Sequence, residues 1–176
     1  KKFSQSITDY SEFLKSLNMG AQIGSFRKQH YERIWQLINK TNQFNLTTKR
    51  VQYGDVVEFS ENPNFITLSG TLKDKFGDNG LVSIIVGKKV DFELHIDIWL
   101  MSCRVFKREL EYAMFDCLMT VSKKENIKKI VGYYSPTPKN KIVKSFYKDL
   151  GFEQVSEDER LTTTWLLPVR EEYQRK

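Results

Sequence analysis

The spacing of apolar residues changes at Asn62-Pro63, and this change limits the fold more than any other feature of the sequence. Before it, apolar residues recur every three or four positions, which predicts amphipathic helices. After it, they alternate every second residue, which predicts β-strands. The helices are expected over residues 8–17, 31–38 and 55–60, and the strands over residues 65–75, 81–87 and 92–101. Such a run of strands indicates an antiparallel meander.

The first two strands of the meander are joined by FGDNG, in which the Asn-Gly pair predicts a hairpin turn because both residues tolerate a positive φ. Ser6 or Thr8 is expected to cap the first helix. The remaining elements are expected to be a strand at 19–24, a helix at 110–121, a strand at 127–134, a helix at 135–150, and strands at 152–155 and 161–167. This order predicts a single α/β (α+β) domain over residues 1–176, with a mixed, mostly antiparallel central sheet flanked by helices.

Composition and charge exclude several classes of protein. No apolar run reaches the roughly 18 residues of a membrane helix and no signal peptide is visible, so we expect a cytoplasmic protein that does not bind membranes. The net charge of +6 suits a solvated surface or an anionic partner, but no nucleic-acid-binding signature is present. The two cysteines and two histidines lack metal-ligand spacing, so we expect free thiols and no metal.

The third strand of the meander has one apolar face and one face with reactive side chains. The second face is expected to carry His95, Asp97, Trp99, Met101 and Cys103. Cys103 precedes a predicted helix, whose amino terminus would favour the thiolate together with Arg104 and Arg108, so it is a candidate nucleophile; the alternative is a small buried residue. His95 and Asp97 lie about 27 and 20 Å from it along a straight strand, too far for a dyad. Asp97 is a further catalytic candidate, because an inward carboxylate has a raised pKa unless it is paired.

The segment NKIVKSFYKDLGF resembles the last motif of GNAT acyltransferases. That motif has an Asn, a Tyr seven residues later and then Gly-Phe, which here are Asn140, Tyr147, Gly151 and Phe152. The resemblance implies a GNAT-like acyltransferase fold, in which Asn140 binds a pantetheine amide and Tyr147 is a general acid at the thioester sulfur. The alternative is a helix with a glycine cap and a core tyrosine.

A GNAT domain also has a loop, Arg/Gln-x-x-Gly-x-Gly/Ala, whose backbone amides bind the pyrophosphate of coenzyme A. The corresponding segment here is RVFKRE, residues 104–109. Lys107 and Glu109 replace both small residues, which argues against tight pyrophosphate binding, although Lys107 and Arg108 could act as point charges. The cofactor-binding candidates that the resemblance implies are Arg104, Phe106, Lys107, Arg108 and Asn140.

Four longer segments closely resemble the carboxy-terminal GNAT-like region of FkbH-type proteins. In order they are INKTNQFNLTTKR, DKFGDNGLVSI, DIWLMSCRVFKRELE and SPTPKNKIVKSFYKDLGF. FkbH-type proteins join an upstream HAD-like domain to this region and are associated with glyceryl thioesters on acyl carrier proteins, made from a phosphorylated glycerate for polyketide biosynthesis. The resemblance, with the absence of an initiator Met, implies a domain from a longer chain. Its implied partners are the HAD-like domain and an acyl carrier protein, and its cofactor is carrier-bound phosphopantetheine or coenzyme A.

The stretch NKTNQFNLTTKR is unusually rich in amides and hydroxyls. In a GNAT fold it would cross the acceptor side of the cleft, where neutral polar groups suit a polyol such as glyceryl better than an amine. The substrate-binding candidates are Asn42, Gln43, Asn45, Thr47 and Thr48, together with Trp99. The alternative is a loop whose side chains bond to nearby backbone.

Two functions of different kinds follow from the sequence. The first is an acyltransferase that moves a small, glyceryl-like acyl group to or from the phosphopantetheine thiol of an acyl carrier protein. The second is a non-catalytic module that docks the carrier, which the altered phosphate loop favours. An acetyl-CoA-dependent N-acetyltransferase is a third possibility.

Overall fold

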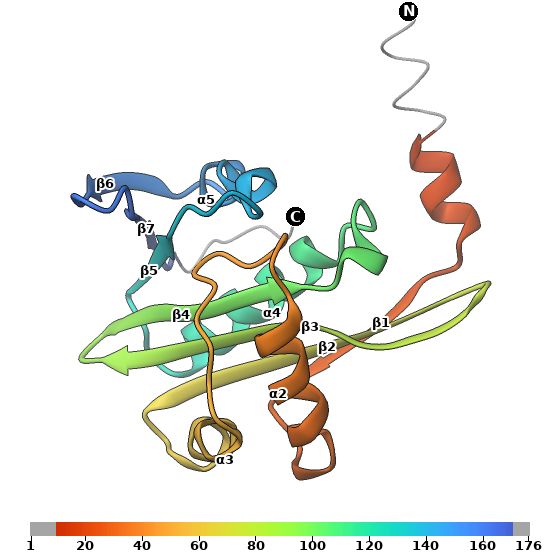
Figure 1. Cartoon of the computed structure of the whole chain (residues 1–176), viewed down its shortest axis with the longest axis horizontal. Coiled ribbons are helices and arrows are strands. Elements are labelled where there is room, and N and C mark those ends of the chain that lie inside the picture. The colour runs from red at the N-terminus through yellow and green to blue at the C-terminus, as the bar shows by residue number, and fades with distance from the viewer. Residues whose placement is uncertain (1–9, 171–176) are drawn as a thin grey trace, which may run out of the picture.

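A seven-stranded sheet forms the centre of the computed structural model, which describes residues 10–170 (Figure 1). Its strands are β1 (Gly20–Gly24), β2 (Phe65–Asp74), β3 (Gly77–Val90), β4 (Glu93–Met101), β5 (Lys129–Tyr134), β6 (Glu153–Glu157) and β7 (Thr163–Pro168). In space they follow the order β1-β2-β3-β4-β5-β7-β6. Neighbouring strands are antiparallel except β4 and β5, which are parallel. The predicted mixed, mostly antiparallel sheet is confirmed.

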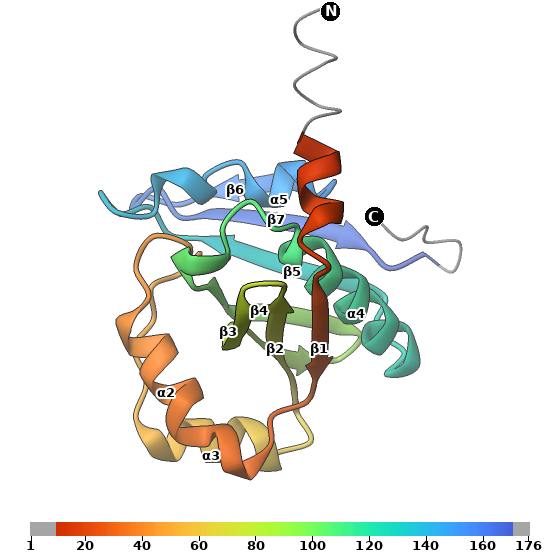
Figure 2. The ribbon, with the colours of Figure 1, turned by 90° about the vertical axis from the view of Figure 1, so that its right-hand side faces the viewer.

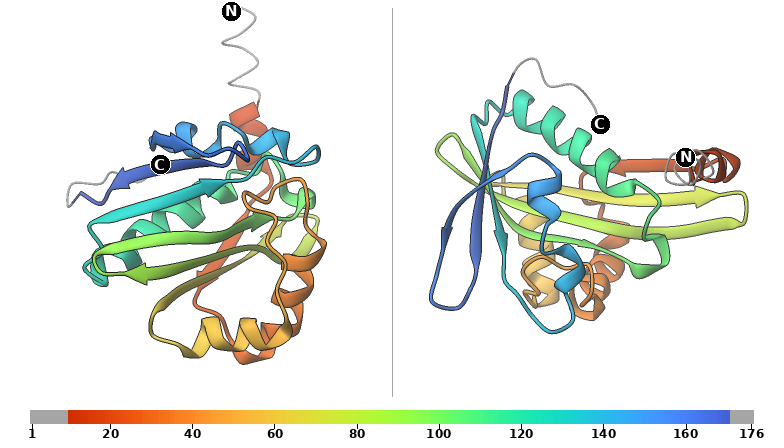
Figure 3. Two further views of the ribbon diagram at one scale, coloured as in Figure 1. Left: turned by 60° about the vertical axis from the view of Figure 1, so that its left-hand side comes forward. Right: turned by 90° about the horizontal axis from the view of Figure 1, so that it is seen from above.

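Helices cover both faces of this sheet. They are α2 (Tyr31–Lys40), α3 (Tyr53–Glu61), α4 (Leu110–Lys124) and α5 (Phe146–Asp149), with 3₁₀ turns η1 (Lys28–His30), η2 (Cys103–Val105) and η3 (Lys141–Val143). The helices α2 and α3 lie on one face and α4 on the other (Figures 2 and 3). Each face has its own apolar cluster, with Ile34 and Val56 in one and Met114 and Phe115 in the other. No helix within residues 10–170 is long and apolar enough to cross a membrane.

The amino-terminal helix is described from residue 10 and ends at residue 16. Its predicted caps, Ser6 and Thr8, lie outside the described residues. Leu14 and Leu17 are buried, as their helical spacing predicts. The Lys75 amide donates a hydrogen bond to the Leu17 carbonyl at 2.8 Å, which ties this helix to the β2–β3 hairpin.

A β-bulge at Asp97 breaks the alternation predicted for β4. Ile96 pairs with Gly87 and Ile98 with Val86, so Asp97 is an extra residue without a partner on β3. The bulge exchanges the two faces of the strand. The cluster on the α4 side contains Leu94, Ile96, Trp99 and Met101. The cluster on the α2 and α3 side contains Ile98 and Leu100. The single polar face predicted for this strand is therefore wrong.

The predicted hairpin between β2 and β3 is present, but its turn lies elsewhere. Asp74 pairs with Gly77, so residues 75 and 76 form the turn. The Asp74 carboxylate supports this turn by accepting a hydrogen bond from the Phe76 amide at 2.8 Å. The Asn-Gly pair lies within β3, at an irregularity in the pairing where Gly80 has φ +66°. Its tolerance of positive φ is therefore used in a bulge and not in the turn.

The continuous helix predicted over residues 135–150 is also wrong. The segment contains only η3 and the four-residue α5. Pro136 and Pro138 have no amide hydrogen and restrict the residues before them, which keeps this stretch from starting a helix. Gly151, with φ +93°, ends the segment in the conformation that glycine favours after a helix.

The strands β4 and β5 separate after a short parallel contact. Residues 93–96 pair with residues 129–132, and beyond them the edge of β4 that faces β5 has no partner strand. Residues 44–46, from the chain that follows α2, cover this edge instead. We call residues 44–46 the inserted segment.

Hydrogen bonds fix the inserted segment on both sides. On the β4 side, the Leu46 amide donates to the Trp99 carbonyl at 3.1 Å and the Met101 amide donates to the Phe44 carbonyl at 3.0 Å. On the β5 side, the Ser135 amide donates to the Leu46 carbonyl at 2.8 Å. The inserted segment thus takes the place of a strand between two strands that have moved apart.

Candidate functional site

A cavity of about 760 Å³, which we call the first cavity, opens beside the carboxy-terminal end of β4. It lies between α2, the segment that follows α2, η2 and the loop after β5. Its lining residues are Arg33, Gln36, Leu37, Lys40, Thr41, Asn42, Gln43, Phe44, Met101, Ser102, Cys103, Arg104, Pro138 and Lys139. The cavity therefore combines a thiol, several amides and several cations.

Four cationic side chains give the first cavity its charge. They belong to Arg33, Lys40, Arg104 and Lys139, all of which are exposed. Within residues 10–170, no acidic residue lines the cavity and none of the four cations is in an ion pair. Unpaired cations beside a concave surface attract anions, and phosphate groups in particular.

Cys103 is exposed on this cavity and is the first residue of η2. The helix α4 begins only at Leu110, so the expectation that a helix amino terminus adjoins the thiol is wrong. Arg104 and the three other cations line the same cavity as this thiol. The second cysteine, Cys117, is half-buried in α4, where burial raises the pKa of its thiol. Only Cys103 is therefore placed to react with a ligand in the cavity.

The amides expected to contact substrate divide into two groups. Asn42 and Gln43 line the first cavity, and Gln43 is exposed. Asn45 is fully buried, and its side chain bonds to the Thr41 carbonyl at 3.1 Å and to the Thr48 amide at 2.9 Å. Asn45 therefore has a structural role. The Asn42 side chain is also engaged, because its Oδ1 accepts a hydrogen bond from the Arg50 guanidinium and its Nδ2 donates to the Lys40 carbonyl at 3.4 Å. Gln43 is the exposed amide of this group on the cavity.

The two threonines of this stretch also bond within the chain. The Thr47 hydroxyl donates to the Asp97 carbonyl at 2.8 Å, which ties the end of the inserted segment to the bulge in β4. The Thr48 hydroxyl donates to the Thr47 carbonyl at 2.8 Å. Neither residue lines the first cavity. The alternative expected for this stretch, bonding to nearby backbone, thus applies to Asn42, Asn45 and Thr48, whereas Thr47 bonds to the backbone of β4.

The loop at residues 104–109 has an unusual backbone for its sequence. Lys107 and Glu109 both have φ +60°, in the left-handed region that glycine enters without strain. These are the two positions where the GNAT motif has small residues. The loop thus keeps the turns that glycine favours, but carries two charged side chains there.

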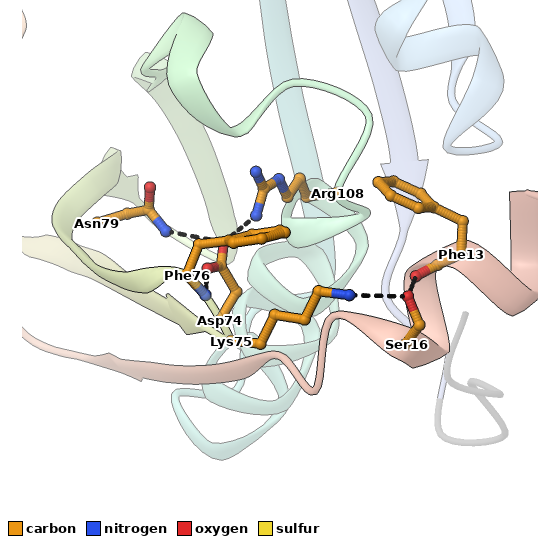
Figure 4. A network of polar contacts seen from close by, with 7 residues as sticks. All are labelled: Phe13, Ser16, Asp74, Lys75, Phe76, Asn79 and Arg108. Carbon is orange, nitrogen blue, oxygen red and sulfur yellow. Dashed lines mark hydrogen bonds and ion pairs between the residues drawn. The ribbon is translucent and has the colours of Figure 1, made fainter.

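Arg108 is tied to the hairpin and is not free to meet a phosphate. Its guanidinium forms an ion pair with Asp74, whose side chain is 3% exposed (Figure 4). The Asn79 side chain donates a second hydrogen bond to this carboxylate at 3.2 Å. The pKa of Asp74 is lowered, chiefly by the hydrogen bond from the Phe76 amide and also by Asn79 and Arg108. The Tyr10 hydroxyl holds the same loop by donating to the Lys107 carbonyl.

Asn140 is fully buried and its side chain is saturated with hydrogen bonds. Its Nδ2 donates to the carbonyls of Asn45 and Ser135, both at 2.9 Å. Its Oδ1 accepts a hydrogen bond from the Thr137 amide at 2.7 Å. Asn140 therefore binds a peptide carbonyl of the inserted segment, whereas the resemblance assigns it to a pantetheine amide.

Tyr147 lies in the core, with 1% of its surface exposed. Its ring packs so closely on β5 that a Cβ at Gly132 would overlap it. Within residues 10–170 its hydroxyl has no partner in hydrogen-bonding geometry, although the Tyr133 backbone is near. Burial raises the pKa of Tyr147 well above its usual value. In this arrangement Tyr147 is a core residue that does not line the first cavity.

Trp99 and Phe106, the two aromatic candidates, support the walls of the site. Trp99 is fully buried, and its ring meets Phe146 edge-on with 4.8 Å between ring centres. Phe106 packs against Phe44 at 5.8 Å between ring centres. Phe44 in turn lines the first cavity. Both candidates therefore act through packing and do not line the cavity.

Asp97 lies apart from Cys103, on a second cavity of about 410 Å³. The expected inward carboxylate is paired, because Lys49 Nζ lies 2.7 Å from Asp97 Oδ1. His95, Thr47 and Tyr133 line this second cavity as well. The bulge thus divides the residues of one strand between two sites.

Three cations of the first cavity were not among the sequence-based candidates, although the sequence contains a signal for two of them. Arg33, Gln36, Leu37 and Lys40 follow the i, i+3, i+4, i+7 spacing of one helix face. All four line the cavity. Lys139 and, in the second cavity, Tyr133 have no comparable pattern.

Comparisons with known proteins identify the fold. No family model and no curated protein matches the sequence. Among solved structures, the ribosomal-protein-S18-alanine N-acetyltransferase of Escherichia coli is similar in structure, with a TM-score of 0.63 and 10% sequence identity. The superposition covers 88% of this chain and 99% of that enzyme. The PaiA N-acetyltransferase of Thermoplasma acidophilum, solved in complex with coenzyme A, matches 85% of this chain over 99% of its own, with 13% identity and a TM-score of 0.63.

A third similar structure is described as a member of the GNAT family. An acetyltransferase of the GNAT family from Staphylococcus aureus matches 86% of this chain over 100% of its own, with 12% identity and a TM-score of 0.64. Identities this low define the fold and not the reaction. The chain therefore has the fold of the GNAT acetyltransferases.

Proposed function

We propose that this domain is an acyltransferase that moves a small acyl group to or from the phosphopantetheine thiol of an acyl carrier protein. The observation that carries the proposal is the first cavity, where the exposed Cys103 thiol lies among four unpaired cations and no carboxylate. Phosphopantetheine carries a phosphate at one end and a thiol at the other. A cationic cavity with a reactive thiol matches both ends.

The reaction would proceed through an acyl-enzyme. The Cys103 thiolate attacks the acyl carbonyl of the donor, a C–S bond forms, and the donor's leaving group departs with its electron pair. The pantetheine thiolate then attacks the new thioester and releases Cys103 as a thiolate. Each thiol gives up one proton before it attacks; the leaving group takes up one of these protons, and the released Cys103 thiolate takes up the other. Arg104 is the cation next in sequence to the thiol and lines the same cavity.

The acyl group would be small and hydroxylated. Gln43 offers an exposed amide donor and acceptor to hydroxyl groups in the first cavity, and Asn42 beside it is held in place by Arg50 and the Lys40 carbonyl. The resemblance to FkbH-type proteins supports a glyceryl group, supplied by an upstream HAD-like domain of the same full-length protein. Both the acyl group and this partner belong to the proposal.

Carrier-bound phosphopantetheine suits this domain better than free coenzyme A. Lys107 and Glu109 place side chains where a pyrophosphate loop has small residues, and the Arg108 charge is paired with Asp74. A pantetheine arm on a carrier has one phosphate and no pyrophosphate. The basic residues around the first cavity would also suit the acidic surface expected of a carrier.

A non-catalytic docking module is the second candidate function, and a specific observation favours it. The inserted segment occupies the β4 edge, and Asn140 and Tyr147 are both buried. A domain without a general acid at its reaction centre could still bind and present a carrier. The test must therefore separate binding from transfer.

Replacing Cys103 with Ala separates the two functions. We expect Cys103→Ala to abolish acyl transfer to a phosphopantetheinylated carrier protein, measured by mass spectrometry of the intact carrier, while amide shifts in the protein still report carrier binding. Cys117→Ala is the matched control and should keep both properties. Unchanged transfer in Cys103→Ala would remove the thiol from the mechanism. Binding without transfer in the unmodified protein, with its donor supplied, would favour the docking module.

Titration with free coenzyme A completes the test. If coenzyme A binds as tightly as the carrier and shifts the amides of residues 104–109, the loop accepts a pyrophosphate and an acetyl-CoA-dependent N-acetyltransferase becomes the leading alternative. We expect the carrier to bind more tightly, with the largest shifts around the first cavity.

A further inference from the structure

The second cavity has a different chemical character from the first. It lies nearer the amino-terminal end of β4, beside the bulge at Asp97. Hydroxyl groups line it, from Thr47, Tyr133, Ser135 and Thr162. The remaining polar lining residues are Lys49, Lys88, His95 and Asp97. Such a lining suits a small polar ligand and not an apolar one.

Three side chains on β4 and β5 form a hydrogen-bonded chain that ends at this cavity. His95 Nδ1 lies 2.7 Å from the Tyr133 hydroxyl, and His95 Nε2 lies 3.2 Å from Glu93 Oε2. The parallel pairing of β4 with β5 brings these residues side by side. Carboxylate, imidazole and hydroxyl in this order are the groups that move a proton from a bound substrate in many enzymes.

The direction of these hydrogen bonds follows from the charge of Glu93. Lys129 Nζ lies 2.6 Å from Glu93 Oε1, and this bond is the main cause of a lowered pKa at Glu93. Glu93 is thus ionised at neutral pH and can only accept hydrogen bonds. In the neutral imidazole of His95, Nε2 therefore carries the hydrogen and Nδ1 accepts one from Tyr133.

The Tyr133 hydroxyl is available to a ligand as an acceptor. Burial, with the charges of Asp97 and Glu93, raises the pKa of Tyr133, so the hydroxyl keeps its proton at neutral pH. That proton is given to His95, and the lone pairs of the oxygen remain. Because Tyr133 lines the cavity, a ligand hydroxyl can donate to this oxygen.

The charged groups of the cavity indicate what else the ligand carries. The Asp97 carboxylate is neutralised by Lys49 at 2.7 Å. Lys88 is exposed, lines the cavity and is in no ion pair within residues 10–170. One cation is therefore left without a counter-charge. A ligand with a carboxylate would supply it.

We propose that the second cavity is a binding site for a small hydroxylated carboxylic acid. A hydroxyl of the ligand donates to Tyr133, and its carboxylate meets Lys88. This site is distinct from the first cavity and does not depend on Cys103.

Lactate and propionate are suitable probes, because they differ by one hydroxyl group. The chain has two histidines, His95 in the cavity and His30 outside it, so imidazole resonances report the site with an internal control. We expect lactate to shift the His95 resonances and leave those of His30 in place. Lactate should bind about fivefold more tightly than propionate, the effect of one hydrogen bond of about 1 kcal/mol. Glycerol, which lacks the carboxylate, should bind more weakly than lactate.

Two substitutions test which residue binds the hydroxyl of the ligand and which binds its carboxylate. Tyr133→Phe should make lactate and propionate bind equally, whereas Tyr112→Phe, on α4 and outside both cavities, should keep the difference. Lys88→Ala should weaken lactate and propionate about equally, and Lys124→Ala, an exposed lysine outside both cavities, should weaken neither. Amide spectra of each variant show whether the fold is kept.

Several outcomes would overturn the proposal. They are equal binding of lactate and propionate to the unmodified protein, shifts of His30 as large as those of His95, or an imidazole nitrogen spectrum with the hydrogen of neutral His95 on Nδ1. The last measurement needs no ligand and no variant. None of these experiments uses a carrier or a thioester, so their failure is separate from any failure of transfer through Cys103.

Discussion

The two cavities lie along the same strand, yet their polar groups are prepared for ligands in opposite ways. The first cavity presents an exposed thiol and exposed cations that form no ion pair within residues 10–170. In the second, His95 and Asp97 are already held by hydrogen bonds or ion pairs, and Lys88 is an exposed cation that forms no ion pair within residues 10–170. Exposed, unpaired side chains adapt to a ligand and select mainly by charge, whereas pre-paired groups select by hydrogen-bond geometry. One strand can therefore supply a permissive site and a restrictive one.

The largest expected change in the free energy of unfolding comes from removing a buried amide, that of Asn140, and is compared with removal of the exposed Gln43 amide on the first cavity. Asn140→Ala should destabilise the fold by about 3 kcal/mol, because it removes one buried and two part-buried hydrogen bonds to backbone groups. Gln43→Ala, at an exposed amide of the first cavity, should change the free energy of unfolding by less than about 0.5 kcal/mol. Denaturant unfolding at pH 7 measures both. Similar losses in the two variants would contradict the assignment of Asn140 as a structural residue.

A second prediction concerns the unpaired cations. Arg104→Ala and Lys139→Ala should each weaken binding of pantetheine 4′-phosphate by about three- to tenfold, equal to roughly 0.7 to 1.4 kcal/mol. Lys49→Ala should have no such effect, because Lys49 belongs to the second cavity and is paired with Asp97. Calorimetric titration at low and high salt provides the measurement. Binding that is insensitive to both substitutions and to salt would mean that charge does not define the first cavity.

A third prediction contrasts an unpaired carboxylate with a paired one. Glu111 is partly buried in α4, one of its oxygens has no partner within residues 10–170, and burial raises its pKa. A carboxyl group whose pKa is raised on folding stabilises the protein below its unfolded pKa and loses this contribution as pH rises. Glu111→Gln should therefore stabilise the fold by about 1 kcal/mol at pH 7 and by little below about pH 4.

Glu93 has the opposite effect from Glu111 on how the stability of the protein depends on pH. Its pKa is lowered, so its contribution to stability is present at neutral pH and is lost as pH falls through the folded-state pKa. Glu93→Gln should therefore destabilise the protein at pH 7. Unfolding curves of the two variants between pH 3 and pH 7 should diverge in opposite directions from the unmodified protein, and parallel curves would contradict the assignment.

The smallest expected effect concerns the backbone of the loop beside the first cavity. Lys107→Gly should be more stable than Lys107→Ala by about 0.5 kcal/mol, because glycine relieves the strain of φ +60° but gains entropy in the unfolded chain. The Ala variant controls for loss of the lysine side chain. Thermal unfolding of both proteins measures the difference. A more stable Ala variant would mean that this residue does not hold the left-handed conformation in solution.

Periodicity was sufficient to predict the sheet but not its irregularities. The change from a helical to a strand period at Asn62-Pro63 predicted the meander, and the motif at Asn140 implied the GNAT fold. The bulge at Asp97 was not predictable, because it adds one residue without any Gly or Pro to mark it. The ion pair of Arg108 with Asp74 joins residues 34 positions apart, and no local pattern encodes such a contact.

The candidate site shows the same limit. Cys103, Arg104, Asn42 and Gln43 were predicted from local patterns and do line one cavity. Tyr147 was assigned from motif spacing, but spacing says nothing about the depth at which a side chain lies. The packing of α5 on β5 at Gly132 decided that depth, and the pairing of β4 with β5 decided the contact of His95 with Tyr133. Local sequence thus identified residues at the ends of elements better than residues between strands.

The inserted segment also bears on the order in which the chain folds. Its hydrogen bonds reach Trp99 and Met101 on one side and Ser135 and Asn140 on the other, the last across 95 positions. Closing so long a loop costs entropy that is recovered only when both partner strands are in place. We therefore expect residues 44–46 to dock late, after β4 and β5 have paired. Before that step the backbone amides and carbonyls along the free edge of β4 have no partners. At this stage of folding we expect the chain to be most able to pair with another copy of itself.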